Sequence, residues 1–250
     1  MDYRFLRISD MGSVRHIEIS MESPLNPLNM DVIGEIGDVI RSSEGKVVVI
    51  SGRNRAFSAG ADIHGFVDLT PEMAYEFATK GHRVMDSIEE HPLPVIAAMH
   101  GFALGGGFEL ALACDFRIAH PETKMGLPEI NLGIIPGFGG TQRLLRIAGE
   151  ARALQMISTG STITAKEAVN FGIVNEVNEN YRERAFELAS ELAAKPHSSL
   201  KFSKRLLRHH DPEAFELEKE FFGRVFGLPD RREGVSAFLE KRKPQFNREQ

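Results

Sequence analysis

The 250-residue chain contains a single cysteine, Cys114, which excludes an internal disulfide and suits a reducing compartment. The residues before it, Ala111, Leu112 and Ala113, are apolar, and this predicts a buried thiol with a packing role. No apolar stretch approaches the ~20 residues that a transmembrane helix needs. Charged residues interrupt the first ten positions, where a secretory signal would have its apolar segment. We therefore expect a soluble, cytoplasmic protein with no membrane partner.

The signatures of several common functional sites are also missing. The chain has nine histidines but no HExxH segment and no Cys/His pairs at metal-ligand spacing. The glycine clusters at 105–107 and 137–140 complete neither a P-loop nor the GxGxxG of a dinucleotide site, and no GxSxG marks a serine hydrolase. The net charge of −5, without a long basic run, argues against nucleic acid as the main partner. We predict neither a metal nor a resident cofactor.

The pattern of apolar residues predicts an α/β fold. Hydrophobic residues make up 42% of the chain and charged residues 26%, as in a soluble domain, with room for an appendage. Segment 14–19 alternates polar and apolar residues, segment 46–51 is apolar between its ends, and helical spacing lies between them. The runs 94–99 and 115–119 flank a further helical pattern. Such repeated units predict mainly parallel strands joined by right-handed crossovers.

Beyond about residue 140 the pattern becomes helical. Residues 164–167 form a capping box, 181–194 form a helix, and two more helices open near 211 and 230. One of these helices carries four phenylalanines on a broad apolar face, which indicates either core packing or a subunit interface: Phe215, Phe221, Phe222 and Phe226. We divide the chain into a core (1–195) and a C-terminal helical region (196–250).

The most informative stretch is residues 94–109, PVIAAMHGFALGGGFE. An apolar run ends at His100-Gly101, and the glycines 105–107 then open a helical pattern. Glycines at such a turn let the backbone approach a ligand, and the first helical amides are free to donate to a negative oxygen. A tight turn without a ligand is the alternative.

A second small-residue segment favours the ligand site. AFSAGADI (56–63) follows the apolar strand 46–51, and its Ala59-Gly60-Ala61 again exposes backbone after a strand. Two such segments could each supply one N–H group to a single carbonyl oxygen. That arrangement is an oxyanion hole, in which one donor is typically worth ~3–4 kcal/mol of transition-state stabilisation.

Two glutamates lie in apolar surroundings near these segments. Glu109 precedes Leu-Ala-Leu-Ala at the start of the helix, and Glu129 lies between Pro128 and Ile130. Solvated carboxylates are the ordinary alternative for both. If they are buried, desolvation raises their pKa values toward the range useful for proton transfer, and the pair could position water and move protons.

Six blocks in order resemble the crotonase (enoyl-CoA hydratase/isomerase) superfamily. They are SPLNPLN (23–29), AFSAGADI (56–63), PVIAAMHGFALGGGFELALACDFRIA (94–119), MGLPEINLGIIPGFGGTQRL (125–144), TGSTITAKEAVNFGIVNEV (159–177) and DRREGVSAFLEKRKPQF (230–246). The resemblance implies a spiral of ββα units with a C-terminal helical trimerisation region, assembled as a homotrimer or homohexamer. It also implies that the amides of Ala61 and Gly106 hold a thioester oxygen.

The resemblance further implies an acyl-CoA substrate, bound near Ala59, Gly60, Asp62, Ile63 and His64. His64 stands where many members have lysine. Segment 137–141 is expected to shape the acyl pocket or a turn, and Pro24–Asn29 either borders the CoA site or forms a structural turn. Hydratases of the family keep both acids, so hydration of a 2-trans-enoyl-CoA is expected. A double-bond isomerase or related acyl-CoA enzyme, and a non-catalytic scaffold or RNA-binding member, are the alternatives.

Overall fold

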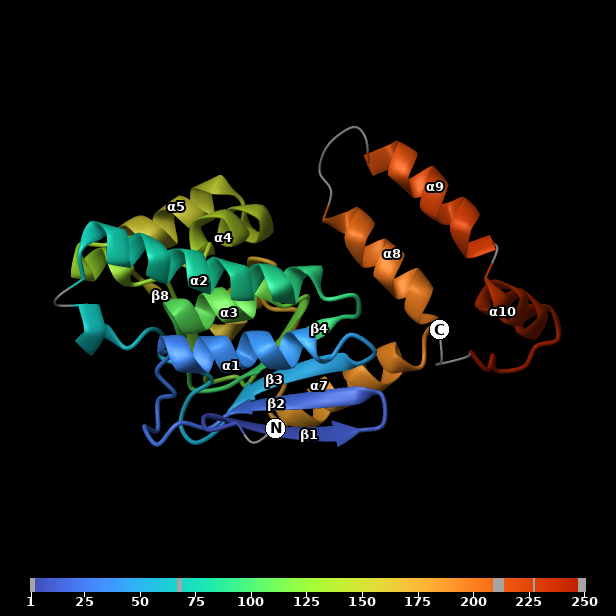
Figure 1. The fold of residues 1–250 in the computed structure, drawn as a ribbon, viewed down its shortest axis with the longest axis horizontal. Coiled ribbons are helices and arrows are strands. Elements are labelled where there is room, and N and C mark those ends of the chain that lie inside the picture. The colour runs from blue at the N-terminus through green and yellow to red at the C-terminus, as the bar shows by residue number, and fades with distance from the viewer. Residues whose placement is uncertain (1–2, 67–68, 209–213, 227, 247–250) are drawn as a thin grey trace.

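The computed structural model describes residues 3–66, 69–208, 214–226 and 228–246, and strands and helices are interspersed along the chain up to α7 (Tyr181–Ala193), after which only helices follow (Figure 1). In chain order these are β1 (Leu6–Met11), β2 (Val14–Ile19), α1 (Met30–Arg41), β3 (Val47–Gly52), the 3₁₀ helix η1 (Ile63–Phe66), α2 (Pro71–Glu90), β4 (Val95–Met99), β5 (Phe102–Leu104), α3 (Gly106–Ala113), β6 (Phe116–Ala119), β7 (Lys124–Gly126), the 3₁₀ helix η2 (Glu129–Leu132), α4 (Gly140–Ala148), α5 (Glu150–Thr159), β8 (Thr162–Thr164), α6 (Ala165–Asn170), β9 (Glu176–Val177), α7 (Tyr181–Ala193), α8 (His197–Leu207), α9 (Ala214–Phe226) and α10 (Pro229–Leu239). The predicted α/β class is confirmed.

A six-stranded sheet in the order β1-β2-β3-β4-β6-β9 forms the scaffold. All neighbouring strands are parallel except the antiparallel pair β1 and β2. Every residue of β3 and β4 is buried, because one face packs with α1, α2 and α3 and the other with α7. Double coverage explains why these two strands are continuously apolar in sequence.

A second, three-stranded sheet in the order β5-β7-β8 holds the turn that starts α3. The strands β5 and β7 are parallel, and β7 and β8 are antiparallel. Each strand has only three residues, too few to show a period in the sequence. The small sheet was therefore not predicted.

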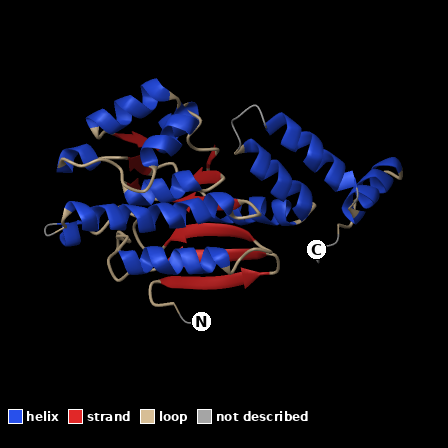
Figure 2. Cartoon of the chain, turned by 45° about the horizontal axis from the view of Figure 1, so that its top comes forward, coloured by secondary structure: helices blue, strands red, loops and turns tan. Residues whose placement is uncertain are grey.

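Helix α2 was also not predicted, although it has 20 residues. Its start is well marked, since Thr70 accepts a hydrogen bond from the N–H of Met73 and Pro71 occupies the first turn. Only four of its residues are fully buried, so the apolar stripe is narrow: Gly81, Val84, Met85 and Ile88. The helix packs beside α1 over the sheet, as Figures 1 and 2 show.

The C-terminal helices α8, α9 and α10 project from one end of this body (Figures 1 and 2). Phe221 on α9 is 2% exposed and stacks on Phe202 of α8 at 4.5 Å, whereas Phe222 and Phe226 are 65% and 49% exposed. Of the predicted phenylalanine face, one ring is thus packed inside the helical region and two rings are exposed on its surface. The side chain of Phe215 lies outside the described residues. The domain boundary at 195/196 and the trimerisation role stay predictions.

Several local predictions are confirmed. Thr164 and Glu167 form the reciprocal capping box at the start of α6. Cys114 is 2% exposed, and burial raises the pKa of its thiol to about 12, as expected for a packing residue. Among the described residues, no helix has both the length and the apolar character needed to cross a membrane.

Candidate active site

A cavity of about 750 Å³ opens where η1, α2, the start of α3 and the segment after β7 meet. Seven of the nine predicted site residues line it: Ala59, Gly60, Ala61, Ile63, Gly106, Glu109 and Glu129. Asp62 is outside the lining, and its N–H donates to the carbonyl of Leu28 at 3.1 Å. The side chain of His64 lies outside the described residues. The structure therefore gathers both glutamates and both predicted amide donors around one space.

Two glycine turns bring the amides of Ala61 and Gly106 close together. A Cβ atom built on Gly106 would lie 3.6 Å from the nitrogen of Ala61, and one built on Gly60 would lie 3.4 Å from the nitrogen of Gly106. Gly60 (φ +98°) and Gly105 (φ +49°) occupy left-handed backbone that favours glycine. In the described part of the chain, neither N–H has a hydrogen-bond acceptor. The pair can therefore donate to an oxygen in the cavity.

Glu109 is held by the backbone of the turn before α4. It is 1% exposed, and its Oε1 accepts hydrogen bonds from the N–H of Phe138 (2.8 Å) and of Gly140 (2.7 Å). A Cβ atom on Gly140 would lie 2.9 Å from that oxygen, so the close approach requires glycine. Burial raises the pKa of Glu109 to about 7; the two amides lower it and the charge of Glu129 raises it. A carboxyl with this pKa can gain or lose a proton near neutral pH.

Glu129 begins η2 and lies against the glycine turn. A Cβ atom on Gly105 would lie 3.0 Å from its Oε1, so the carboxyl rests against the backbone that starts α3. Its Oε2 is buried and has no hydrogen-bond partner among the residues that the structure describes. Burial raises the pKa of this carboxyl. A carboxyl with one unpartnered oxygen and a raised pKa, lining a cavity, is typical of a proton-transfer group.

The raised pKa of Glu109 predicts an effect on stability. The unfolded chain loses this proton near 4.5 and the folded chain near 7, so the contribution to stability is complete below pH 4.5 and is lost as the pH rises through 7. That difference is worth ~3 kcal/mol at about 1.4 kcal/mol per pH unit. We expect Glu109→Gln to raise the free energy of unfolding by ~1–3 kcal/mol at pH 8 and by little at pH 4.5, measured by denaturant titration. Glu122→Gln, at an exposed residue, is the control, and equal stabilities of wild type and Glu109→Gln at pH 8 would contradict the prediction.

The sequence left two alternative roles for each of the segments 137–141 and 24–29, and the structure shows how each segment is used. Phe138 of the segment 137–141 lines the cavity, and the segment grips Glu109, so it shapes the pocket and a turn together. Asn26, in the segment 24–29, is buried with φ +49°, and its Nδ2 donates to the carbonyls of Arg53 and Ala56 at 2.8 Å each. Ser58 donates to its carbonyl. The structural-turn alternative therefore holds for Asn26, and none of residues 24–29 lines the cavity.

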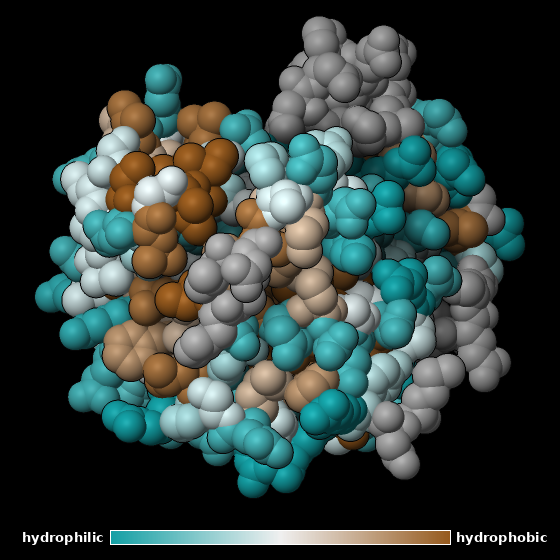
Figure 3. All heavy atoms as spheres, turned by 60° about the vertical axis from the view of Figure 1, so that its left-hand side comes forward, coloured by the Kyte–Doolittle hydropathy of each residue, from teal (hydrophilic) through white to brown (hydrophobic). Residues whose placement is uncertain are grey.

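Much of the cavity wall was not predicted. It comes from Phe66 of η1, from Leu69, from α2 (Ala74, Phe77, Ala78 and His82) and from the segment 132–136. Leu132 and Ile135 are 56% and 71% exposed. Figure 3 shows that hydrophobic residues gather on the side of the molecule that is at the left in Figure 1. Within the described ranges, no group of three His, Cys, Asp or Glu residues could hold a metal ion. The space is mainly apolar, with a few convergent polar groups, as in small-molecule sites.

Comparison with known proteins shows similarity along nearly the whole chain. The model of the enoyl-CoA hydratase/isomerase family matches residues 11–249. A probable enoyl-CoA hydratase of Bacillus subtilis is 43% identical over 90% of this chain and 92% of its own. The crotonyl-CoA hydratase of Syntrophomonas wolfei is 40% identical over 98% and 99%. The crystal structure of an enoyl-CoA hydratase from Bacillus anthracis superposes with a TM-score of 0.93 at 34% identity, covering 98% of this chain and all of that one. The matched region thus spans the residues that line the cavity as well as the strands of the scaffold.

Proposed function

The chain belongs to the enoyl-CoA hydratase/isomerase family, and we propose that it adds water to a 2-trans-enoyl-CoA to give a 3-hydroxyacyl-CoA. One observation carries this proposal: Glu109 and Glu129 both line the cavity that the amides of Ala61 and Gly106 also reach. Adding water to an activated alkene needs a polarised carbonyl, a positioned water and a proton donor. These four groups supply all three. The relatives named as hydratases support the same reaction.

The geometry suggests a division of labour. The thioester oxygen accepts hydrogen bonds from Ala61 and Gly106, which draws electrons away from C3. Glu109 has Oε1 occupied by two amides, so Oε2 is left to orient the water. The water oxygen bonds to C3, the alkene electrons move to C2, and Glu129 delivers a proton to C2. Glu109 accepts the proton that the water loses, and Glu129 gives up the proton that reaches C2, so the two carboxyls together end with as many protons as they had.

The substrate's CoA portion is proposed to border Ala59, Gly60, Asp62, Ile63 and His64. Ala59, Gly60 and Ile63 support this by lining the cavity beside the amide pair. No metal and no redox cofactor enters the proposed scheme, and CoA is part of the substrate. We also propose that the enzyme works in the cytoplasm, where a single buried thiol suits the reducing environment.

The decisive experiment offers crotonyl-CoA to the purified protein and identifies the product by chromatography and mass. We expect 3-hydroxybutyryl-CoA, with the rate unchanged after exhaustive dialysis against EDTA and in the absence of NAD. Migration of a double bond without uptake of water would instead identify an isomerase. A protein that turns over no acyl-CoA would be a scaffold or binding member. Loss of turnover on chelation, restored by a divalent ion, would overturn the metal-free scheme.

We propose a homotrimer or homohexamer as the working assembly. The exposed rings of Phe222 and Phe226 support an interface, because large apolar groups that gather on a projecting region are typical of contact surfaces. Sedimentation at micromolar concentration should show three or six chains. An active monomer would contradict the prediction.

A further inference from the structure

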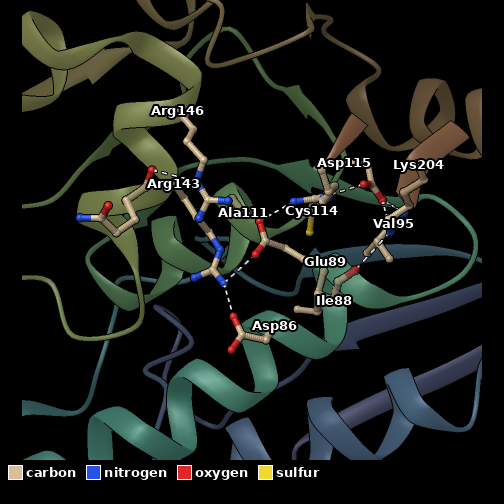
Figure 4. Close-up of polar contacts among 12 residues, drawn as sticks. Asp86, Ile88, Glu89, Val95, Ala111, Cys114, Asp115, Arg143, Arg146 and Lys204 are labelled. Atoms are coloured by element: carbon tan, nitrogen blue, oxygen red, sulfur yellow. Dashed lines mark hydrogen bonds and ion pairs between the residues drawn. The ribbon is translucent and has the colours of Figure 1, made fainter. Parts of the chain in front are cut away.

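A buried arginine lies directly behind the turn that grips Glu109. Arg143 on α4 is 4% exposed, and its Nη1 donates to the carbonyl of Phe138 at 2.6 Å. Its Nη2 donates to Asp86 at 2.7 Å and to Glu89 at 3.0 Å, both on α2 (Figure 4). The same Phe138 residue therefore donates its N–H to Glu109 and accepts from Arg143 through its carbonyl.

We propose that Arg143 is a positioning residue that holds the Phe138–Gly140 turn, and through it Glu109, in place for the reaction. The proposal rests on the proposed function and assigns Arg143 no contact with substrate. The turn has a flexible backbone, since Gly139 takes φ +94° and two of its three residues are glycines. A planar guanidinium with several donors can fix a carbonyl and two carboxylates together, which an ammonium cannot do in the same geometry.

The position of Phe138 also affects the oxyanion segment. Its ring stacks on Phe77 at 5.1 Å, and a Cβ atom on Gly106 would lie 3.2 Å from it. Movement of the turn would therefore disturb two parts of the cavity together: the oxygen of Glu109 and the wall beside the Gly106 amide.

Charged groups continue from Arg143 to the C-terminal helices. Glu89 also accepts a hydrogen bond from Arg208, whose other terminal nitrogen donates to Asp115 at 2.8 Å. Lys204 on α8 donates to the same Asp115 at 2.6 Å (Figure 4). The side chains of Arg143, Glu89, Asp115 and Lys204 are all less than 15% exposed, so water screens these pairs little. Glu89 thus binds both Arg143, which holds the turn at Glu109, and Arg208, which follows α8.

The charges around Glu109 set the direction of a pH effect. Arg143 from α4 lowers the pKa of Glu109, and Glu129 from η2 raises it. His82 from α2 lines the same cavity. Removing the positive charge of Arg143, or releasing the two amides, favours the protonated carboxyl. The pH at which Glu109 ionises should then rise.

The test compares Arg143→Met with Arg146→Met, a matched control on the same helix whose arginine is exposed. In Arg143→Met we expect kcat for crotonyl-CoA to fall ~10–100-fold, the scale of a small misplacement of a reacting group, with KM within about threefold. The acidic limb of the pH profile should move to higher pH. Arg146→Met should match the wild type in all three measurements.

An infrared titration makes the test independent of turnover. The protonated carboxyl band of Glu109, assigned by its loss in Glu109→Gln, should disappear at higher pH in Arg143→Met than in the wild type. If Arg143→Met does not fold, Arg143→Gln decides, since it keeps a donor for the Phe138 carbonyl but removes the charge. An unchanged titration in whichever of these variants folds would overturn the proposal, as would wild-type kcat in folded Arg143→Met. A wild type that titrates as expected but hydrates no enoyl-CoA would instead overturn the proposed function.

Discussion

Glu129→Gln is expected to lower kcat for enoyl-CoA hydration by ~10²–10⁴, the usual contribution of an acid–base group. The amide has nearly the volume of the carboxyl but carries no proton that it can deliver to C2. Binding should be largely kept, because the cavity is mainly apolar and Glu129 contributes only part of one wall. The change should therefore appear in kcat with little change in KM.

Steady-state kinetics with crotonyl-CoA measure this prediction, and Glu122→Gln is the matched control at an exposed glutamate of the same sequence region. Within the described ranges the buried Oε2 of Glu129 has no hydrogen-bond partner to lose, so the variant should fold like the wild type. Hydration at near the wild-type rate in Glu129→Gln would remove this residue from the mechanism.

Gly106→Pro should lower turnover by ~10²–10³ or more, because it deletes one of the two N–H donors proposed for the thioester oxygen. Gly106 is the first residue of α3, the position at which a helix tolerates proline best. Gly105 precedes it, and glycine reduces the usual steric conflict with a following proline. The loss should therefore reflect the missing donor more than damage to the helix.

Gly106→Ala is the control for crowding, since its Cβ would also lie 3.2 Å from the ring of Phe138 but its N–H remains. We expect the alanine variant to keep much more activity than the proline variant, with both folded by circular dichroism. Equal activities in the two variants would assign the loss to steric crowding and exclude this amide as a donor.

The scaffold was largely predictable because the pattern of apolar residues in its longer strands indicates which faces are buried. The segment 46–51 is apolar on both sides and became β3, while 14–19 alternates and became β2 beside the antiparallel β1. The three-residue strands β5, β7 and β8 carry no period, and α2 buries too few residues to stand out. Local sequence therefore identified the elements with a clear apolar run or period, and it missed strands too short to show one and a helix with a narrow apolar stripe.

The candidate site also has features that the sequence predicted and features that only the structure revealed. Composition and spacing alone pointed to the glycine turns at 60 and 105–107 and to two glutamates in apolar surroundings, because backbone freedom and desolvation are local properties. Only the tertiary structure decided which oxygen of Glu109 is occupied, that Gly140 and Phe138 hold it, and that α2 forms a wall of the cavity. These contacts join residues about 30 or more positions apart, and the distances between such residues are set by how the layers pack. The sequence by itself thus determined which functional groups are present, and the packing of the layers determined their positions and orientations.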